Sequence, residues 1–150
     1  MRAIIQRVTE ASVKIEGSIH NQISNGLMVL LGIEDADSHQ DASWIIRKIS
    51  QMRIFNDESG VMNKSLLDIQ GEILIISQFT LFASTRKGNR PSYIQAAKPE
   101  VAIPIYHNFL EQWEKETAIQ PKAGIFGADM KVKLVNDGPV TISIDSKNKA

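Results

Sequence analysis

The chain contains no cysteine, which excludes disulfide bonds and thiolate metal sites. It also lacks a long apolar run, since no stretch approaches the ~20 residues that span a bilayer. The first residues, Met1 to Arg7, carry polar side chains where a signal peptide would need an apolar core. These absences predict a cytoplasmic protein with no membrane partner.

An excess of charge of either sign is also missing, because 17 basic residues balance 17 acidic ones. Binding along a long nucleic-acid backbone depends on cations at many phosphates, so the balance argues against a DNA-binding protein. A small RNA footprint remains possible. The one local basic cluster, Arg86 to Arg90, is either a contact for a few phosphates or an ordinary solvated loop.

The sequence also lacks the usual signs of a catalytic site, namely a well-placed histidine, a set of metal ligands and a phosphate-binding loop. The three histidines, His20, His39 and His107, fall in a predicted hairpin, a helix start and a helix, where none is placed to activate a serine. No pair of histidines or carboxylates has the spacing of metal ligands together with a third partner, and no glycine-rich phosphate loop opens a helix. Asp35, Asp37 and Asp41 could mimic a cation loop, but they lack the glycine turn and terminal glutamate of an EF-hand, and a capped helix start explains them better. We therefore expect neither a metal nor a cofactor.

Length and hydrophobic pattern predict a single domain over residues 1–150, with a loose tail from residue 146 to 150. Several apolar or alternating runs are typical of strands, and Glu16 to Ser18 supplies a hairpin turn. We predict a mixed α/β fold, with a largely antiparallel sheet in a layered or barrel-like core and two main helices on one side. The predicted strands are residues 4–8, 12–15, 27–33, 72–77, 130–135 and 140–144.

Two segments have the spacing of buried helix faces. The first begins near Asp37 or Ser38, either of which can cap it, and the second has Pro99 in its first turn. Pro104 lies inside the second segment, so a kink or a later start is expected there. The apolar positions in helical register are Ala42, Ile45, Ile46 and Ile49 in the first, and Ala102, Ile105, Tyr106, Phe109, Leu110 and Trp113 in the second.

Two segments, Ser77 to Leu81 and Asn136 to Thr141, place polar backbone and small hydroxyls at the edges of apolar strands. An active site made mainly of main chain would have this pattern. Taken singly, Gly138-Pro139 suits an ordinary turn, and Ser77 is explained equally well as a strand-end hydroxyl that caps the backbone or as a contact for the substrate. Phe126 and Met130 are most simply core residues.

Taken together, these segments resemble the D-aminoacyl-tRNA deacylases, the D-tyrosyl-tRNA deacylase family, over nearly the whole chain. Five motifs occur in the same order, which makes a chance match improbable, although a single tripeptide would be weak evidence. The motifs are Gln6-Arg7-Val8, Ser77-Gln78-Phe79-Thr80-Leu81, Thr85-Arg86-Lys87-Gly88-Asn89-Arg90-Pro91-Ser92, Phe126-Gly127-Ala128-Asp129-Met130 and Asn136-Asp137-Gly138-Pro139-Val140-Thr141.

The resemblance implies a homodimer that hydrolyses the ester between a D-amino acid and tRNA, and that also accepts glycyl-tRNA(Ala). It implies that the Gly138-Pro139 bond is cis and enters the partner's pocket around residues 77–80. By the same resemblance Arg7 braces the Gly-Pro carbonyls, and Phe126 and Met130 line a pocket for the terminal adenine.

The chemistry expected of such a site uses few side chains. Backbone N–H groups of Phe79 and Thr80 would stabilise the negative charge that develops on the ester oxygen. Attack by water, positioned by Gln78 or by the ribose 2′-hydroxyl, is the preferred hypothesis, and a Thr80 nucleophile is the alternative. A fixed backbone wall would reject L-amino acids by steric clash while D-amino acids and glycine pass. A non-catalytic dimeric module that holds the tRNA acceptor end is the competing interpretation.

Overall fold

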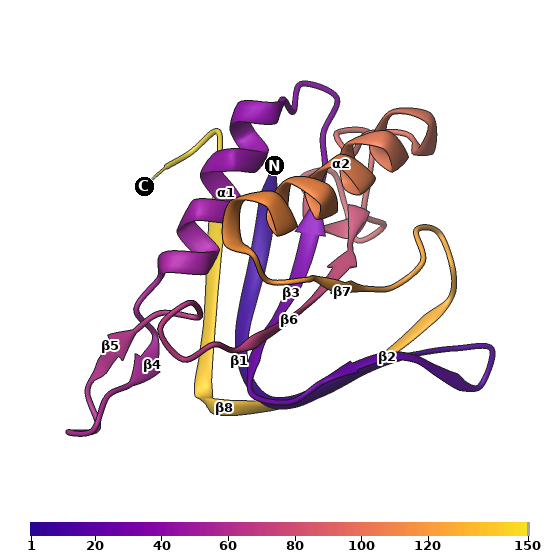
Figure 1. Cartoon of the computed structure of the whole chain (residues 1–150). Coiled ribbons are helices and arrows are strands. Elements are labelled where there is room, and N and C mark those ends of the chain that lie inside the picture. The colour runs from indigo at the N-terminus through magenta and orange to yellow at the C-terminus, as the bar shows by residue number, and fades with distance from the viewer. Residues whose placement is uncertain (150) are drawn as a thin grey trace.

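A six-stranded mixed sheet carries both helices on the same face (Figure 1). The structure is a computed structural model that describes residues 1–149. The elements are β1 (Arg2–Ile15), β2 (Ser18–Ile23), β3 (Gly26–Gly32), α1 (His39–Gln51), β4 (Phe55–Asn56), β5 (Met62–Lys64), β6 (Glu72–Ser77), the 3-10 turn η1 (Phe79–Phe82), α2 (Pro99–Thr117), β7 (Lys122–Ala123) and β8 (Met130–Asp145).

The strand order is β2-β1-β3-β6-β7, and β8 pairs with the other side of β1. The pairs β1–β2, β1–β3 and β1–β8 are antiparallel, whereas β3–β6 and β6–β7 are parallel. β1 and β8 bend together, so that their far halves and the β1–β2 hairpin curl beneath the rest of the sheet (Figure 1). The predicted class, a mixed and largely antiparallel sheet in a layered or barrel-like core with two helices on one side, is confirmed.

Two apolar clusters lie on opposite faces of this sheet. The larger cluster fills the space between the sheet and the helices and contains the predicted face of α1 together with Tyr106, Phe109 and Trp113 of α2. The smaller cluster lies inside the curl and includes Val13, Met28, Leu74 and Ile76. β3 and β6 are buried on both faces because they separate the two clusters, which explains their uninterrupted apolar sequences.

The start of α1 is fixed by a reciprocal cap. The Ser38 hydroxyl accepts a hydrogen bond from the Asp41 N–H, and the Asp41 carboxylate accepts one from the Ser38 N–H. The alternative cap proposed from sequence, Asp37, instead accepts a hydrogen bond from the Glu34 N–H at 2.9 Å. The buried residues Ala42, Ile45, Ile46 and Ile49 confirm the predicted helical face.

α2 begins at Pro99 and continues through Pro104, so the later start considered from the sequence is wrong. A proline at this position leaves the carbonyl of Glu100 without its usual N–H partner. Glu100 and Pro104 are both exposed, so water can solvate that carbonyl. The proline is tolerated because the hydrogen bond that it removes lies in the first turns and on the solvent side.

The chain from Met130 to Asp145 forms one strand, where the sequence predicted two strands separated by a turn. Both halves of β8 pair with β1, from Ile15↔Met130 at one end to Arg2↔Asp145 at the other. Residues 136–139 are therefore an elbow in a continuous strand, at which the register with β1 shifts. β1 is likewise one strand, where two shorter ones were predicted.

Ser146 and Lys147, the first two residues of the predicted loose tail, are held by hydrogen bonds, so the prediction is wrong for these two. Ser146 is buried and its hydroxyl accepts a hydrogen bond from the Met1 ammonium at 3.0 Å. The Lys147 Nζ donates to the Asp41 carboxylate at 2.7 Å. Ala150, the last residue of the predicted tail, lies outside the described residues. Within residues 1–149, neither helix is long and apolar enough to cross a membrane.

Candidate active site

A cavity of about 310 Å³ opens where β6 leaves the sheet. One wall is Ser77, Gln78 and Phe79, and the opposite wall is the segment from Phe126 to Met130 that leads into β8. The fold thus brings together two motifs that lie about 50 residues apart in the sequence. The complete lining is Ile76, Ser77, Gln78, Phe79, Phe126, Gly127, Ala128, Asp129, Met130 and Val132.

The wall at Ser77 to Thr80 is formed by the abrupt end of a parallel strand. The Gln78 N–H makes the last sheet-like hydrogen bond, to the Leu31 carbonyl at 2.7 Å, and the chain then turns into η1. A Cβ on Gly32 would lie 3.0 Å from the Leu81 Cβ and 3.2 Å from the Gln78 carbonyl oxygen, so the turn packs tightly against bare backbone. Glycine at this position lets η1 lie directly on β3.

Two backbone N–H groups at this turn are free to act on a ligand. In the part of the chain that the structure describes, the N–H groups of Phe79 and Thr80 donate to no protein acceptor. They belong to the first turn of η1, where such groups have no partner within the turn itself. The N–H of Phe79 therefore lies in the cavity lining and that of Thr80 directly follows it along the chain, and both are without a protein acceptor among the described residues.

The hydroxyl of Thr80 is already engaged. The amide Nε2 of Gln78 donates a hydrogen bond to the Thr80 Oγ1, which joins these two predicted site residues. None of the three histidines lines the cavity within residues 1–149. An accepted hydrogen bond withdraws electron density from the Thr80 oxygen, and no imidazole is present beside it to remove the proton.

The opposite wall is a half-buried aromatic and thioether surface. Phe126 lies 6.0 Å from the Tyr106 ring, centroid to centroid. Met130 packs so closely on Gly124 that a Cβ there would collide with the Met130 Sδ. Phe126 and Met130 therefore line the cavity, and Phe126 packs against the larger apolar cluster and Met130 against the smaller one, so the packing role expected of them is confirmed.

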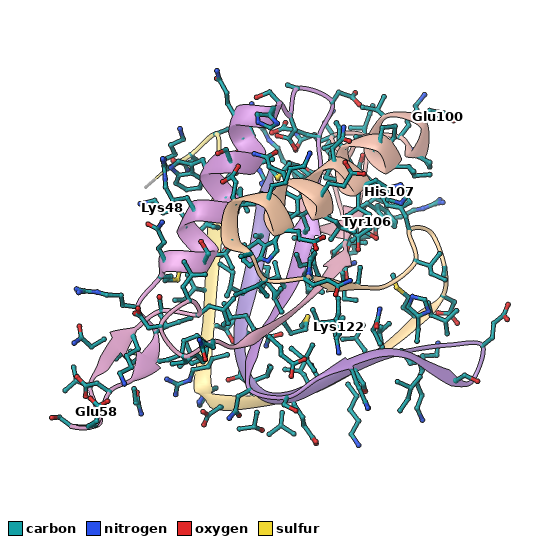
Figure 2. The ribbon with its side chains drawn as sticks, viewed as in Figure 1. Lys48, Glu58, Glu100, Tyr106, His107 and Lys122 are labelled. Carbon is teal, nitrogen blue, oxygen red and sulfur yellow. The ribbon has the colours of Figure 1, made fainter. Side chains whose placement is uncertain are left out.

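Tyr106, labelled in Figure 2, is the buried support of this wall. Its hydroxyl donates to the Ile75 carbonyl of β6 at 2.7 Å. Burial raises the pKa of Tyr106 above its ordinary value, and a hydrogen bond from the Gly124 backbone opposes this only in part. The side chain is therefore neutral and connects α2, β6 and the segment before Phe126.

The second motif forms the exposed elbow of β8. The peptide bond between Gly138 and Pro139 is cis, as the resemblance predicted, and both residues are exposed. Asn136 spans the elbow from inside: its Oδ1 accepts a hydrogen bond from the Val140 N–H at 2.7 Å, and its Nδ2 donates to the Val140 carbonyl at 3.2 Å. We refer to residues 136–139 as the corner.

Arg7 holds the corner from the core side. Its side chain is buried, with Nε donating to the Asp137 carbonyl at 2.8 Å and Nη1 donating to the Ile54 carbonyl at 2.7 Å. The second contact links the corner to the start of the β4–β5 hairpin, and Asn56 Oδ1 lies 3.4 Å from the same nitrogen. The hydrogen bond described here falls on Asp137, one residue before the Gly-Pro carbonyls expected from the resemblance.

The corner and the cavity are separate in one protomer. Gly138 and Pro139 do not line the cavity within the described residues, whereas Ser77, Gln78 and Phe79 do. β1 connects the two places: the Arg2 Nη1 donates to the Leu81 carbonyl of η1 at 3.0 Å, and Arg7 contacts the corner. Of the nine predicted site residues, the fold brings five together in the cavity lining and places Arg7, Gly138 and Pro139 elsewhere. The ninth, Thr80, follows the lining residue Phe79 in η1 and does not itself line the cavity.

Sequence reasoning missed several residues near these places. Nothing in the pattern around Ile54 and Asn56 indicated a partner for Arg7, because a short two-stranded hairpin has little periodicity. Ile76 and Val132 line the cavity although their positions predicted only strand residues. Tyr106 was expected in the helix face, but its link to the cavity wall depends on contacts distant in sequence.

A family profile and curated relatives both match nearly the whole chain. The sequence profile of the family described as D-Tyr-tRNA(Tyr) deacylase matches residues 4–145. The D-aminoacyl-tRNA deacylase of Flavobacterium johnsoniae is 60% identical, and that of Bacteroides fragilis strain YCH46 is 58% identical; each match covers 99% of both chains.

Two solved structures are also similar. The c-Myc DNA Unwinding Element Binding Protein has a TM-score of 0.92 and 45% identity, with 97% of this chain and 98% of that chain covered. A probable eukaryotic D-amino acid tRNA deacylase has a TM-score of 0.77 at 17% identity, covering 95% and 98%, which supports the fold alone.

The fold is a mixed α/β domain with a cavity at the end of β6, and the matched family and the highly similar relatives place the chain in the class of the aminoacyl-tRNA deacylases. The chain belongs to the D-Tyr-tRNA(Tyr) deacylase family. The resemblance inferred from the five motifs is thereby confirmed, together with the expectation of an enzyme of the D-aminoacyl-tRNA deacylase class.

Proposed function

We propose that the protein hydrolyses the ester bond of D-aminoacyl-tRNA, releasing the free D-amino acid and tRNA. The observation that carries the proposal is the cavity, which joins the Ser77 to Phe79 backbone to the Phe126 to Met130 segment in a member of this family. The protein would act as one domain, in the cytoplasm, where aminoacyl-tRNA is made and used. Glycyl-tRNA(Ala) is a further proposed substrate, because glycine has no side chain to exclude.

The terminal adenosine fits the wall formed by Phe126 and Met130. An aromatic face and a polarizable thioether suit a purine ring. The volume of about 310 Å³ is near the lower end of the range for small-molecule sites. With the base on this wall, the ester at the ribose would lie toward Gln78 and Phe79 on the other side.

Hydrolysis at this position needs charge stabilisation more than a side-chain nucleophile. The free N–H groups of Phe79 and Thr80 can donate to the oxyanion that forms as water attacks the ester carbonyl. The Gln78 amide and the ribose 2′-hydroxyl of the substrate are the groups available to position that water. No metal or cofactor takes part in this proposal.

Replacing Thr80 with valine should leave most of the deacylation rate. Valine keeps the backbone N–H and the shape of the side chain, and it removes only the hydroxyl that already accepts a hydrogen bond from Gln78. Single-turnover rates on D-tyrosyl-tRNA measure this. Ser84→Val is a control for loss of a hydroxyl outside the cavity lining. A Thr80→Val protein that is folded and inactive would instead identify Thr80 as the nucleophile.

Chirality would be sensed by the corner of a second protomer. The corner is exposed, and Arg7 and Asn136 fix it from the core side, so it can act as a firm wall. Against such a wall, the side chain of an L-amino acid would collide, whereas a D-amino acid and glycine would pass. Rejection of L-aminoacyl groups by backbone alone would also allow many different D-side chains.

The position of the corner supports a two-fold dimer with shared sites. Arg2 and Arg7 lie five residues apart on β1, roughly 17 Å at the usual rise of a strand. On the face of the sheet away from the helices, Ile4 is half-buried and its neighbour on β8, Ser143, is exposed. A two-fold axis through this open face near Ile4 would place each corner against the η1 turn of the other protomer.

The deciding measurement is release of amino acid from D-tyrosyl-tRNA and L-tyrosyl-tRNA by the purified protein. We expect rapid release from the D-form and none above background from the L-form. Equal release from both would indicate a nonspecific esterase. Binding of both without release would favour the alternative, a non-catalytic dimeric module that holds the tRNA acceptor end.

A further inference from the structure

An aromatic pair lies exposed at the rim of the cavity. Phe79 and Tyr93 pack edge to face with ring centroids 5.0 Å apart, yet 53% of Phe79 and 40% of Tyr93 remain accessible. Phe79 itself lines the cavity. Exposed aromatic rings that cluster on a surface are typical of binding sites, because a ligand that covers the rings removes apolar area from water.

A basic loop leaves the protein next to this pair. Ser84 and Ser92 exchange two backbone hydrogen bonds, at 2.8 and 2.9 Å, which close the loop at its base directly before Tyr93. Between them, Arg86, Lys87 and Arg90 are all exposed. Gly88 has a φ of +108° with no atom close to its missing Cβ, so it provides the turn at the loop tip.

The charge around the loop is of one sign. From residue 73 to residue 99 the sequence has four basic side chains and no acidic one, although the whole chain has no net charge. The basic loop follows the cavity wall of residues 77–79 along the chain, and the aromatic pair connects the two places. The cavity, the aromatic pair and the basic loop therefore follow one another, so that a partly apolar pocket is succeeded by exposed rings and then by positive charge.

We propose that the aromatic pair stacks the base that precedes the terminal adenosine of an RNA 3′ end, and that the basic loop binds the next phosphates. The inference rests on the proposed function, since it assumes that the terminal adenosine occupies the cavity. A single-stranded 3′ end matches the path because its unstacked bases can lie on aromatic faces while its phosphates meet cations.

Direct binding of uncharged ligands tests the proposal without depending on hydrolysis. Fluorescence anisotropy would measure Kd for a short RNA ending in 3′-CCA, and competition would measure it for adenosine alone. In the Tyr93→Ala protein we expect the Kd for the RNA to rise about 5-fold to 150-fold, the range measured for loss of one base-aromatic stack, with no change for adenosine. Tyr93→Phe is the matched control and should keep normal affinity, because it retains the ring.

The basic loop is tested by its salt dependence. Replacing Arg86, Lys87 and Arg90 together with glutamine should weaken binding of the RNA, and should reduce the slope of log K against log salt by about 2 for three lost contacts to a single strand. Glutamine at all three positions should not affect adenosine. A slope identical to that of the unaltered protein would exclude phosphate contacts by this loop.

Three outcomes would overturn the proposal. The first is an unchanged RNA affinity in Tyr93→Ala, and the second is an equal loss for RNA and adenosine, which would make Tyr93 a support of the cavity. The third is a change of oligomeric state in Tyr93→Ala by analytical ultracentrifugation, which would make the pair a protein interface. Failure of the proposed function would look different, as Tyr93-dependent RNA binding with no release of D-tyrosine from D-tyrosyl-tRNA.

Discussion

Replacing Gly138 with alanine is expected to reduce kcat/KM for D-tyrosyl-tRNA by about 100-fold, the loss associated with a displacement of about 1 Å in a catalytic site. The φ of Gly138 is +140°, which L side chains rarely adopt. A Cβ there would lie 2.8 Å from the Val140 Cγ2 and 3.1 Å from the Arg7 Nη2. The corner must move to accommodate the methyl group, and the proposed wall of the partner's site moves with it.

Gly17→Ala provides the matched control for this result. Gly17 also has a positive φ, +80°, but no atom lies within 4 Å of its missing Cβ, and it is in the β1–β2 turn. The Gly17→Ala protein should lose some stability and keep its deacylation activity. If Gly138→Ala deacylated D-tyrosyl-tRNA at the normal rate, the corner would not belong to the active site. Thermal unfolding of both variants would separate a local displacement from general instability.

Replacing Arg7 with lysine should lower the free energy of unfolding by about 1–3 kcal/mol, the usual cost of a buried acceptor that loses its hydrogen bond. The guanidinium reaches the Asp137 carbonyl and the Ile54 carbonyl with two different nitrogens. A single ammonium on a flexible stem cannot reproduce that fork. We also expect a large fall in deacylation, about 100-fold, because the corner loses its support on the core side.

Urea unfolding followed by circular dichroism measures the first effect, and the D-tyrosyl-tRNA assay measures the second. Arg47→Lys, an exposed position on α1, is the control and should change neither. Normal activity in Arg7→Lys would mean that the β8 elbow holds its shape through Asn136 alone. Normal stability with lost activity would instead indicate that Arg7 contacts the substrate.

The parts of the fold that could be predicted from the sequence are those that local patterns determine. The apolar runs of β3 and β6 identify strands covered on both faces, and the spacing of Ile45, Ile46 and Ile49 identifies the buried side of α1. The Ser38 cap could also be predicted, because it needs only residues three apart. Hydrophobic periodicity carries this information over short distances.

The elbow of β8 could not be predicted in the same way. Asn136-Asp137-Gly138-Pro139 has the composition of a hairpin turn, and only its pairing on both sides with β1 makes it part of one strand. The same limit applies to the site. The motifs predicted a site at Ser77 to Thr80 and Gly138-Pro139, but the link from Arg7 to Ile54 and the contact of Phe79 with Tyr93 depend on tertiary packing.

The stretch of β1 from Arg2 to Arg7 fixes a distance in the proposed dimer. Arg2, at the start of this strand, contacts the η1 turn, and Arg7, near its middle, holds the corner, so the residues between these two arginines set the span over which two protomers must match. Adding or deleting a residue in this stretch would change that span in both copies at once and would also reverse which side chains face the helices. The proposed dimer therefore constrains the number of residues between Arg2 and Arg7, independently of which side chains occupy those positions.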